Sequence, residues 1–310
     1  MKEKEQLMQK TLVVWLGALL CCALWGSAFP CIKLGYQMFA IAAEDVAAQI
    51  LFAGCRFSLA GILALLIGSG MSRKLLIPKR SSWGKVFRLS MLQTVAQYLF
   101  FYVGLANTTG VKASIIEGVN VFIAILVASL IFHQEALTGK KILGCAIGFA
   151  GVVLVNLTGS GMDLSMTFMG EGFIFLSTVA YAFSSVFLKR YSKEENPVVL
   201  SGWQFFIGGI IMMICGWLAG GRLTVWTGSG VGMLVYLALV SAVAYSLWGI
   251  LLKYNPISKV AVFGFMNPVF GVILSALLLN EKNQASGWMT IAALLLVSIG
   301  IYITAKENEA

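Results

Sequence analysis

Charged residues are scarce in this sequence. Lys, Arg, Asp and Glu make up 11% of the 310 residues, whereas a soluble globular chain carries about 25%. Hydrophobic residues reach 59%, which excludes a disordered chain and does not fit a pair of soluble domains. The composition therefore indicates an integral membrane protein.

The residues that build metal, redox and hydrolytic centres are also few or dispersed. His133 is the single histidine, and the six cysteines form no CxxC pair and no Cys/His cluster. We therefore expect no metal and no cofactor. The sequence has no HExxH, no Gly-x-Ser-x-Gly and no pair of carboxylates within an apolar run. These absences argue against an enzyme embedded in the membrane.

Long apolar runs dominate the chain instead. A transmembrane helix needs about 20 predominantly apolar residues. Runs of about this length occupy residues 12–33, 46–68, 86–106, 112–133, 140–157, 169–189, 198–219, 230–252, 257–279 and 286–305. The sequence therefore predicts an all-α membrane protein with ten transmembrane helices.

The basic residues, which give the chain a net charge of +9, are distributed unevenly between these runs. With the N-terminus in the cytoplasm, 17 of the 22 basic residues fall in cytoplasmic segments and Arg56 lies within a run. The four on the outside are Lys33, Lys112, Arg222 and Lys282. Cytoplasmic segments of membrane proteins are enriched in Lys and Arg. We therefore expect a multi-pass protein of the cytoplasmic (inner) membrane with both termini inside, and no nucleic-acid partner.

The two halves of the chain share a pattern of residues in the same order. Residues 25–33 align with residues 181–189, because in both an aromatic residue precedes a lysine by eight positions. The other matched pairs are Tyr98 with Tyr245, Gly118 with Gly264, Ser129 with Ser275 and Glu135 with Glu281. Matched segments are five runs apart, and an odd number reverses their orientation in the membrane. We expect residues 1–157 and 158–310 to form two inverted five-helix repeats with a ligand site between them.

Several short motifs follow one another in an order typical of one transporter family. They are Trp25-Gly26-Ser27-x-Phe29-Pro30-x-x-Lys33, Arg56-Phe57 with Ala60, Ala113-Ser114, Glu135, and Asn267-Pro268-Val269-Phe270 with Glu281. On these motifs the whole chain resembles the drug/metabolite transporter superfamily, specifically its EamA-like branch. The resemblance implies a secondary transporter that moves small metabolites by alternating access, foremost by exporting amino acids or related compounds. The chain departs from the pattern at Phe122, which matches Pro268, and at the polar residues Glu117 and Asn120.

Two ionisable residues stand inside the predicted spans. Such residues cost about 2.5 to 3.5 kcal/mol at the centre of a membrane helix and are therefore functional candidates. Arg56 lies near the middle of the second run, and Glu117 lies one to two turns into the fourth. We expect Glu117 to bind a proton or a cationic group and so to couple transport to protons. The alternatives are an ion pair of Glu117 with Arg56 or Lys112, and a tie between helices made by Arg56.

Polar and aromatic residues near these charges are candidates for lining a central cavity. Besides Arg56 and Glu117, the predicted substrate-binding residues are Gln93, Gln97, Tyr98, Asn120, Trp203, Gln204, Tyr245 and Asn267. Gln93, Gln97 and Tyr98 share one helical face, as do Glu117 and Asn120. Pro30 and Pro268 each remove a helical hydrogen bond, so we expect a kink or gate at each.

The expected partners are a small-molecule substrate, the lipid bilayer and protons, with a monomer or a homodimer as the assembly. Organic cations and nucleotide-linked sugars are alternative substrates. A nucleotide-linked sugar fits less well, because Arg56 is the only deep basic residue and Lys33 lies near the mouth. A membrane-embedded enzyme is the alternative from a different functional class.

Overall fold

The computed structural model describes residues 2–108, 113, 116–156, 166–278 and 287–307. All regular secondary structure among these residues is helical, as the apolar runs predict. In the first half the helices are α1 (Lys2–Gln9), α2 (Thr11–Met38), α3 (Val46–Ser72), α4 (Trp83–Leu89), α5 (Gln97–Ala106), α7 (Asn120–Leu126) and α8 (Gly139–Asn156). In the second half they are α9 (Phe173–Tyr191), α10 (Pro197–Leu218), α11 (Gly228–Tyr254), α12 (Ile257–Ala261), α13 (Met266–Leu278) and α14 (Gly287–Glu307).

Short segments with wider or tighter turns interrupt or extend several of these helices. The π-helical segments are η2 (Ser90–Ala96), η3 (Val127–Ile131) and η4 (Phe168–Gly172), and the 3₁₀ segments are η1 (Arg80–Ser82) and η5 (Val262–Phe265). Segment η2 joins α4 to α5, so that one continuous helical segment runs from Arg80 to Ala106.

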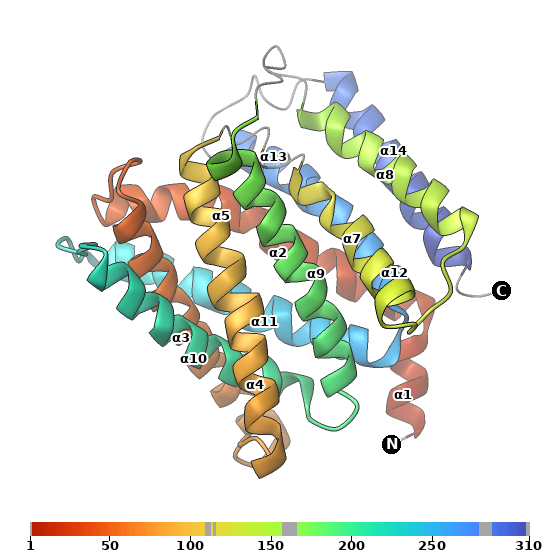
Figure 1. The fold of residues 1–310 in the computed structure, drawn as a ribbon, viewed down its shortest axis with the longest axis horizontal. Helices are drawn as coiled ribbons and strands as arrows, with labels where there is room; N and C mark the ends of the chain where they lie inside the picture. The colour runs from red at the N-terminus through yellow and green to blue at the C-terminus, as the bar shows by residue number, and fades with distance from the viewer. Residues whose placement is uncertain (1, 109–112, 114–115, 157–165, 279–286, 308–310) are drawn as a thin grey trace.

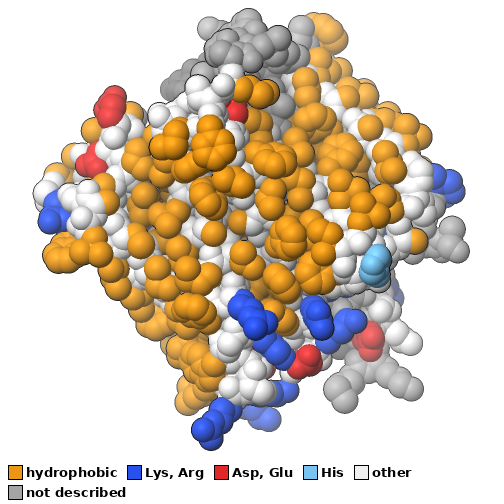
Figure 2. Space-filling model, in the orientation of Figure 1, with side chains coloured by type: hydrophobic (Ala, Val, Ile, Leu, Met, Phe, Trp, Pro, Cys, Tyr) orange, Lys and Arg blue, Asp and Glu red, His pale blue; other side chains and the backbone are white. Residues whose placement is uncertain are grey.

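Six of the described helical segments are long and apolar enough to cross a bilayer. They are Thr11–Met38, Val46–Ser72, Arg80–Ala106, Phe168–Tyr191, Pro197–Leu218 and Gly228–Tyr254. Shorter apolar helices cover Ile116–Ile131, Ile257–Gly271 and Ile291–Lys306. A broad band of hydrophobic side chains faces outward (Figure 2), and water-soluble proteins rarely expose an apolar patch of that extent. The chain is therefore a multi-pass membrane protein, and the count of ten spans stays a prediction.

Two helix boundaries differ from the sequence prediction for identifiable reasons. Helix α2 continues past Lys33 to Met38, because Tyr36 and Phe39 pack on Phe52 with ring centroids 5.6 and 5.3 Å apart. The third span begins at Arg80 instead of residue 86. The backbone N–H of Lys79 donates a 2.9 Å hydrogen bond to Glu195, which fixes the start of that segment.

The most extensive helix contacts are between α3 and α10 and between α8 and α14 (Figure 1). Glycines bring the backbones of α3 and α10 together. A Cβ atom at Gly61 would lie 2.4 Å from the backbone nitrogen of Phe206, and one at Gly209 would lie 2.3 Å from that of Ser58. Small residues allow this close approach in membrane bundles.

The contact between α8 and α14 follows the same principle. A Cβ atom at Gly300 would lie 2.5 Å from the carbonyl oxygen of Gly144 and 2.6 Å from the backbone nitrogen of Gly148. The Gly144–Gly148 pair therefore allows the backbones of α8 and α14 to approach closely.

We expect Gly61→Ala to lower the stability of the protein in detergent by about 1–3 kcal/mol, because the added methyl group forces α3 and α10 apart. The measurement is thermal unfolding of the purified variant. Gly70→Ala is the matched control on the same helix, since a Cβ atom there meets nothing within 4 Å. A similar melting temperature for the two variants would show that the close backbone contact at Gly61 does not determine the stability of the protein.

The remaining contacts place five elements around the centre of the bundle. Helix α2 packs against both α11 and α13, and α9 packs against both α5 and α7 (Figure 1). Helix α11 also contacts α3, and α10 contacts η2. The middle of α2, α3, α10 and α11 and the junction of η2 with α5 therefore meet in one region.

Candidate functional site

Aromatic side chains fill the region where these elements meet. We call them the central aromatic cluster: Trp25, Phe57, Tyr98, Phe205, Tyr245 and Trp248. The ring centroids of Phe57 and Tyr98 are 4.3 Å apart, and those of Trp25 and Tyr245 are 5.0 Å apart. The hydroxyl groups of Tyr98 and Tyr245 are hydrogen-bonded at 2.7 Å. These two tyrosines occupy matching positions in the two halves of the sequence, so matched residues from both halves meet at the centre.

Arg56 of α3 borders this cluster and is only 3% exposed. Its guanidinium lies 5.1 Å from the centroid of the Phe57 ring and acts electrostatically on the hydroxyls of Tyr98 and Tyr245. Its Nε donates to the carbonyl oxygen of Leu237 at 3.3 Å, and its Nη2 donates to Ser241 Oγ at 2.9 Å. Arg56 thus ties α3 to α11.

This tie leaves Arg56 with capacity for a ligand. A guanidinium has five N–H donors, and the two hydrogen bonds to α11 use two of them. In the part of the chain that the structure describes, no carboxylate forms a salt bridge with Arg56. A buried cation without a counterion is unfavourable. The position is therefore suited to an anionic group from outside the protein.

Two buried polar atoms at the cluster and one on α13 lack a hydrogen-bond partner among the described residues. They are Trp25 Nε1, Gln97 Oε1 and Asn267 Oδ1. Gln97 precedes Tyr98 in the chain and its side chain lies beside Tyr245. Asn267 lies on α13, which packs against α2. Buried polar groups are normally hydrogen-bonded, so these atoms are candidates for contact with a bound molecule or water.

The predicted residues Gln93 and Gln204 bind each other instead. Gln204 Nε2 donates to Gln93 Oε1 at 2.7 Å, and Thr94 Oγ1 donates to Gln204 Oε1 at 3.2 Å. Both glutamines are buried. Gln93 therefore faces α10, whereas Tyr98 faces α11 through its hydrogen bond to Tyr245.

Glu117 lies on the segment that leads into α7, Asn120 is the first residue of α7, and both are half-buried. A Cβ atom at Gly264 would lie 3.8 Å from Asn120 Oδ1, so this segment faces η5. Among the described residues, no ion pair joins Glu117 to Arg56. The alternative partner, Lys112, lies outside the described residues.

Trp203 is placed apart from the central aromatic cluster. Its indole N–H donates to the carbonyl oxygen of Leu76 at 2.9 Å, and its ring packs on Trp83 with centroids 5.0 Å apart. Leu76 belongs to the connection after α3. Trp203 therefore anchors this connection to α10.

The two predicted kink prolines differ in their local structure. Helix α2 continues through Pro30 without a break. Pro268 is the third residue of α13 and follows the 3₁₀ segment η5, so the irregular turn precedes the proline. The first turn of a helix tolerates proline. The two helices meet closely, because a Cβ atom at Gly26 would lie 2.4 Å from that of Phe270.

A second polar group lies at the end of the bundle near α12. Glu135 accepts hydrogen bonds from Lys141 Nζ at 3.1 Å, from the backbone N–H of Ser258 at 3.0 Å, and from the Ser258 hydroxyl. Lys141 and Glu135 are both buried. Glu135 thus anchors α8 and α12 to each other.

No group of three or more His, Cys, Asp or Glu side chains that could hold a metal occurs within the residues described. The six cysteines there are free thiols, four of them buried. Sequence reasoning did not select Trp25, Ser241 or Phe205 for the site, although Trp25 stands within the first of the quoted motifs. Aromatic residues are so frequent in this chain that only their packing distinguishes them.

Comparison with known proteins identifies the family of this chain. The model of the EamA-like transporter family matches two stretches, residues 12–157 and 168–305. The chain belongs to the EamA-like transporter family. The resemblance seen in the sequence is thereby confirmed, and this EamA-like protein is a transporter of the membrane and not an enzyme.

Curated relatives of this EamA-like transporter match it over almost their whole length. An uncharacterized transporter of Archaeoglobus fulgidus is 27% identical over 95% of this chain and 99% of its own. A probable amino-acid metabolite efflux pump of Escherichia coli is 28% identical over 92% of each chain. The protein of that name from Salmonella typhimurium is 26% identical over 92% of each chain.

The fold of this EamA-like transporter also matches a solved crystal structure. The TM-score is 0.75, with 96% of this chain and 97% of the other covered. The sequences are 17% identical, so the comparison concerns the fold.

Proposed function

We propose that this EamA-like transporter exports small metabolites that carry a carboxylate, foremost amino acids or related compounds, and binds them at the central aromatic cluster. The observation that carries the proposal is Arg56, a buried guanidinium without a carboxylate partner among the described residues. The names of the Escherichia coli and Salmonella typhimurium relatives support the same class of substrate.

In this proposal, different groups bind the two ends of an amino acid. The free donors of Arg56 and the unpartnered N–H of Trp25 would bind the carboxylate, because charge-assisted hydrogen bonds are the strongest available in a protein. The unpartnered oxygens of Gln97 and Asn267, together with Glu117, would accept hydrogen bonds from the ammonium group. The aromatic rings between them would pack against an apolar side chain.

Two observations support inverted repeats and alternating access. The family model matches two stretches of similar length, one in each half. The first helix of each half also packs on helices of the other half. Helix α2 packs on α11 and α13 of the second half, and α9 packs on α5 and α7 of the first half. Helices that correspond in the two halves, α3 with α10 and α8 with α14, lie against each other. A site between two such halves opens to one side at a time when the halves rock.

The distribution of basic residues supports cytoplasmic termini in the inner membrane. Lys and Arg side chains gather mainly along the lower edge of the molecule, below the hydrophobic band (Figure 2). The anchor formed by Glu135, Lys141 and Ser258 lies at this cytoplasmic end in the proposed topology. The prolines at positions 30 and 268, in the closely packed α2 and α13, are proposed as hinges of the movement.

The other candidate substrates fit the site less well. An organic cation without a carboxylate would be repelled by the buried guanidinium of Arg56. A nucleotide-linked sugar carries two phosphates, and no second basic side chain among the described residues borders the central aromatic cluster.

A thermal-shift screen with the purified protein tests the proposed substrate class. A ligand at 100 times its Kd stabilises the folded state by about 2.7 kcal/mol, so we expect particular amino acids to raise the melting temperature by several degrees. The methyl esters of the same amino acids are the matched control, because they lack the negative charge. Equal shifts from acid and ester, or shifts from organic cations alone, would overturn the assignment.

A further inference from the structure

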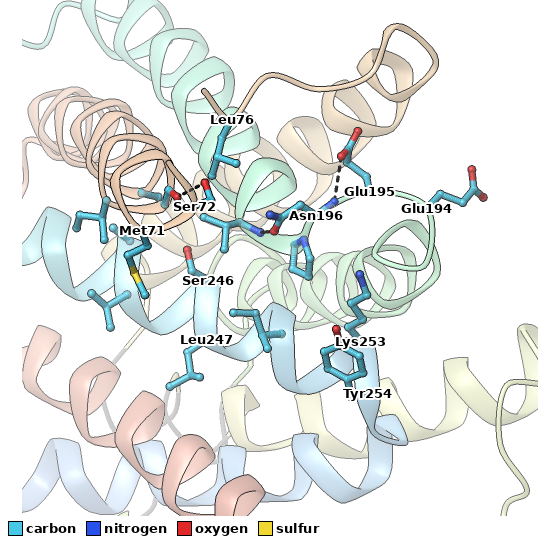
Figure 3. A pocket seen from close by; sticks show the side chains of 18 of the residues that line it. Met71, Ser72, Leu76, Glu194, Glu195, Asn196, Ser246, Leu247, Lys253 and Tyr254 are labelled. Carbon is cyan, nitrogen blue, oxygen red and sulfur yellow. Dashed lines mark hydrogen bonds between the residues drawn. The ribbon is translucent and has the colours of Figure 1, made fainter. Parts of the chain in front are cut away.

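A groove of about 700 Å³ lies between the C-terminal halves of α3 and α11, beside the start of α10 (Figure 3). It is separate from the central aromatic cluster. Helices α3 and α11 are in direct contact between the groove and the cluster. The alanines at positions 60, 64, 238 and 242 form one buried cluster there, and Arg56 donates hydrogen bonds to α11.

The walls of the groove are apolar. Ile67 and Met71 come from α3, and Val243, Leu247 and Ile250 come from α11. Met71 and Val243 are 85% and 40% exposed, so the groove opens toward the surrounding bilayer. Apolar surface is stabilised by contact with hydrocarbon instead of water. The walls therefore suit an acyl chain.

The rim of the groove is basic. Lys79, Lys193 and Lys253 lie on it together with Glu194 and Glu195. The Lys253 ammonium lies over the Tyr254 ring, 5.7 Å from its centroid. Figure 3 shows the Glu194 side chain directed away from the groove, where it forms a salt bridge with Lys85.

Both carboxylates of the rim are engaged by hydrogen bonds from the protein. The hydrogen bond from Lys85 and its charge lower the pKa of Glu194. Burial acts to raise the pKa of Glu195, but hydrogen bonds from the backbone N–H groups of Lys79 and Asn196 leave it below its usual value. Both carboxylates therefore stay ionised, and together with Lys85 the lysines of the rim outnumber them, so the rim has a net positive charge.

One polar atom on the wall also lacks a partner. Ser246 Oγ is buried without a hydrogen bond among the described residues, and Ser246 lines the groove between its apolar walls and its rim. A hydroxyl at this level can donate to an ester carbonyl, the group that joins an acyl chain to a glycerol headgroup.

We propose that this groove binds an acidic phospholipid of the cytoplasmic leaflet, with one acyl chain between α3 and α11 and the phosphate at Lys193 and Lys253. The placement in that leaflet rests on the proposed topology, with both termini in the cytoplasm. An acidic lipid fits the charge of the rim, and the cytoplasmic leaflet supplies such lipids.

Native mass spectrometry of the full chain in detergent tests the proposal, with phosphatidylglycerol and phosphatidylcholine of the same acyl chains as probes. We expect phosphatidylglycerol to bind about 10- to 30-fold more tightly, since each lysine near an anionic lipid contributes about 1 kcal/mol. The double variant Lys193→Ala/Lys253→Ala should bind the two lipids alike. Equal binding by the unmodified protein, or an unchanged preference in the double variant, would overturn the assignment of the headgroup site.

Val243→Trp tests the acyl-chain site, because the indole fills the groove. We expect it to lower retention of both lipids at least about fivefold, which is about 1 kcal/mol. Val235→Trp is the matched control, as Val235 lies on the same helix, is 37% exposed and does not line the groove. Equal retention by the two variants would refute the site. Ser246→Phe provides a second filling substitution if Val243→Trp does not fold, as judged by size-exclusion chromatography.

Discussion

Arg56→Ala is expected to weaken binding of a carboxylate-bearing substrate at least about a hundredfold, since a charge-assisted hydrogen bond contributes about 1.5–3 kcal/mol and two of them would be lost. Arg56→Lys should recover only a small part, because an ammonium cannot form the paired hydrogen bonds of a guanidinium. The measurement is the Kd of the strongest ligand from the thermal-shift screen, determined by calorimetry on the purified variants.

The control for this prediction separates ligand binding from the tie between helices. Ser241→Ala removes the acceptor that lies 2.9 Å from Arg56 Nη2 and leaves the guanidinium in place. We expect it to lower the melting temperature while changing the Kd less than about threefold, which is less than 1 kcal/mol. If Ser241→Ala weakens binding as much as Arg56→Ala does, Arg56 acts through packing alone.

Glu117→Gln is expected to remove the dependence of transport on a proton gradient. The amide keeps the size and hydrogen-bonding capacity of the side chain but cannot exchange a proton. Coupling between two sites is typically a 5- to 150-fold effect, so we expect gradient-driven transport to fall at least about tenfold. Exchange of substrate without a gradient should persist. The measurement is uptake into proteoliposomes with and without an imposed pH difference.

The matched control is Glu135→Gln, which changes another carboxylate of the same half of the chain. Glu135 is held by Lys141 and Ser258, so we expect this variant to lose stability and to keep the response to the gradient. If Glu117→Gln leaves both the rate and its pH dependence unchanged, Glu117 does not couple transport to protons.

The helices and several central residues could be predicted from the sequence because each rests on a strong physical constraint. Apolar runs long enough for a bilayer are conspicuous in a chain with few charges. A buried arginine is unfavourable enough to single out Arg56. The shared spacing of Tyr98 and Tyr245 in the two halves anticipated their meeting at the centre.

Other features depend on local geometry that the sequence does not display. Gln93 is held by Gln204 of α10, whereas Tyr98 is hydrogen-bonded to Tyr245 of α11, and the sequence does not display which helix each side chain meets. Trp203 is engaged by the carbonyl oxygen of Leu76, which requires the connection after α3 to fold back onto α10. The role of Trp25 emerges only from its packing on Tyr245 and Trp248.

Counterflow in proteoliposomes tests most directly whether the central aromatic cluster is a transport site. Vesicles that contain the protein are loaded with an unlabelled amino acid identified by the thermal-shift screen and diluted into the labelled compound. We expect transient accumulation of label with the unmodified protein and none with Arg56→Ala or in vesicles loaded with buffer alone. Absence of accumulation for every compound that binds the unmodified protein, or equal accumulation with Arg56→Ala, would contradict transport through this site.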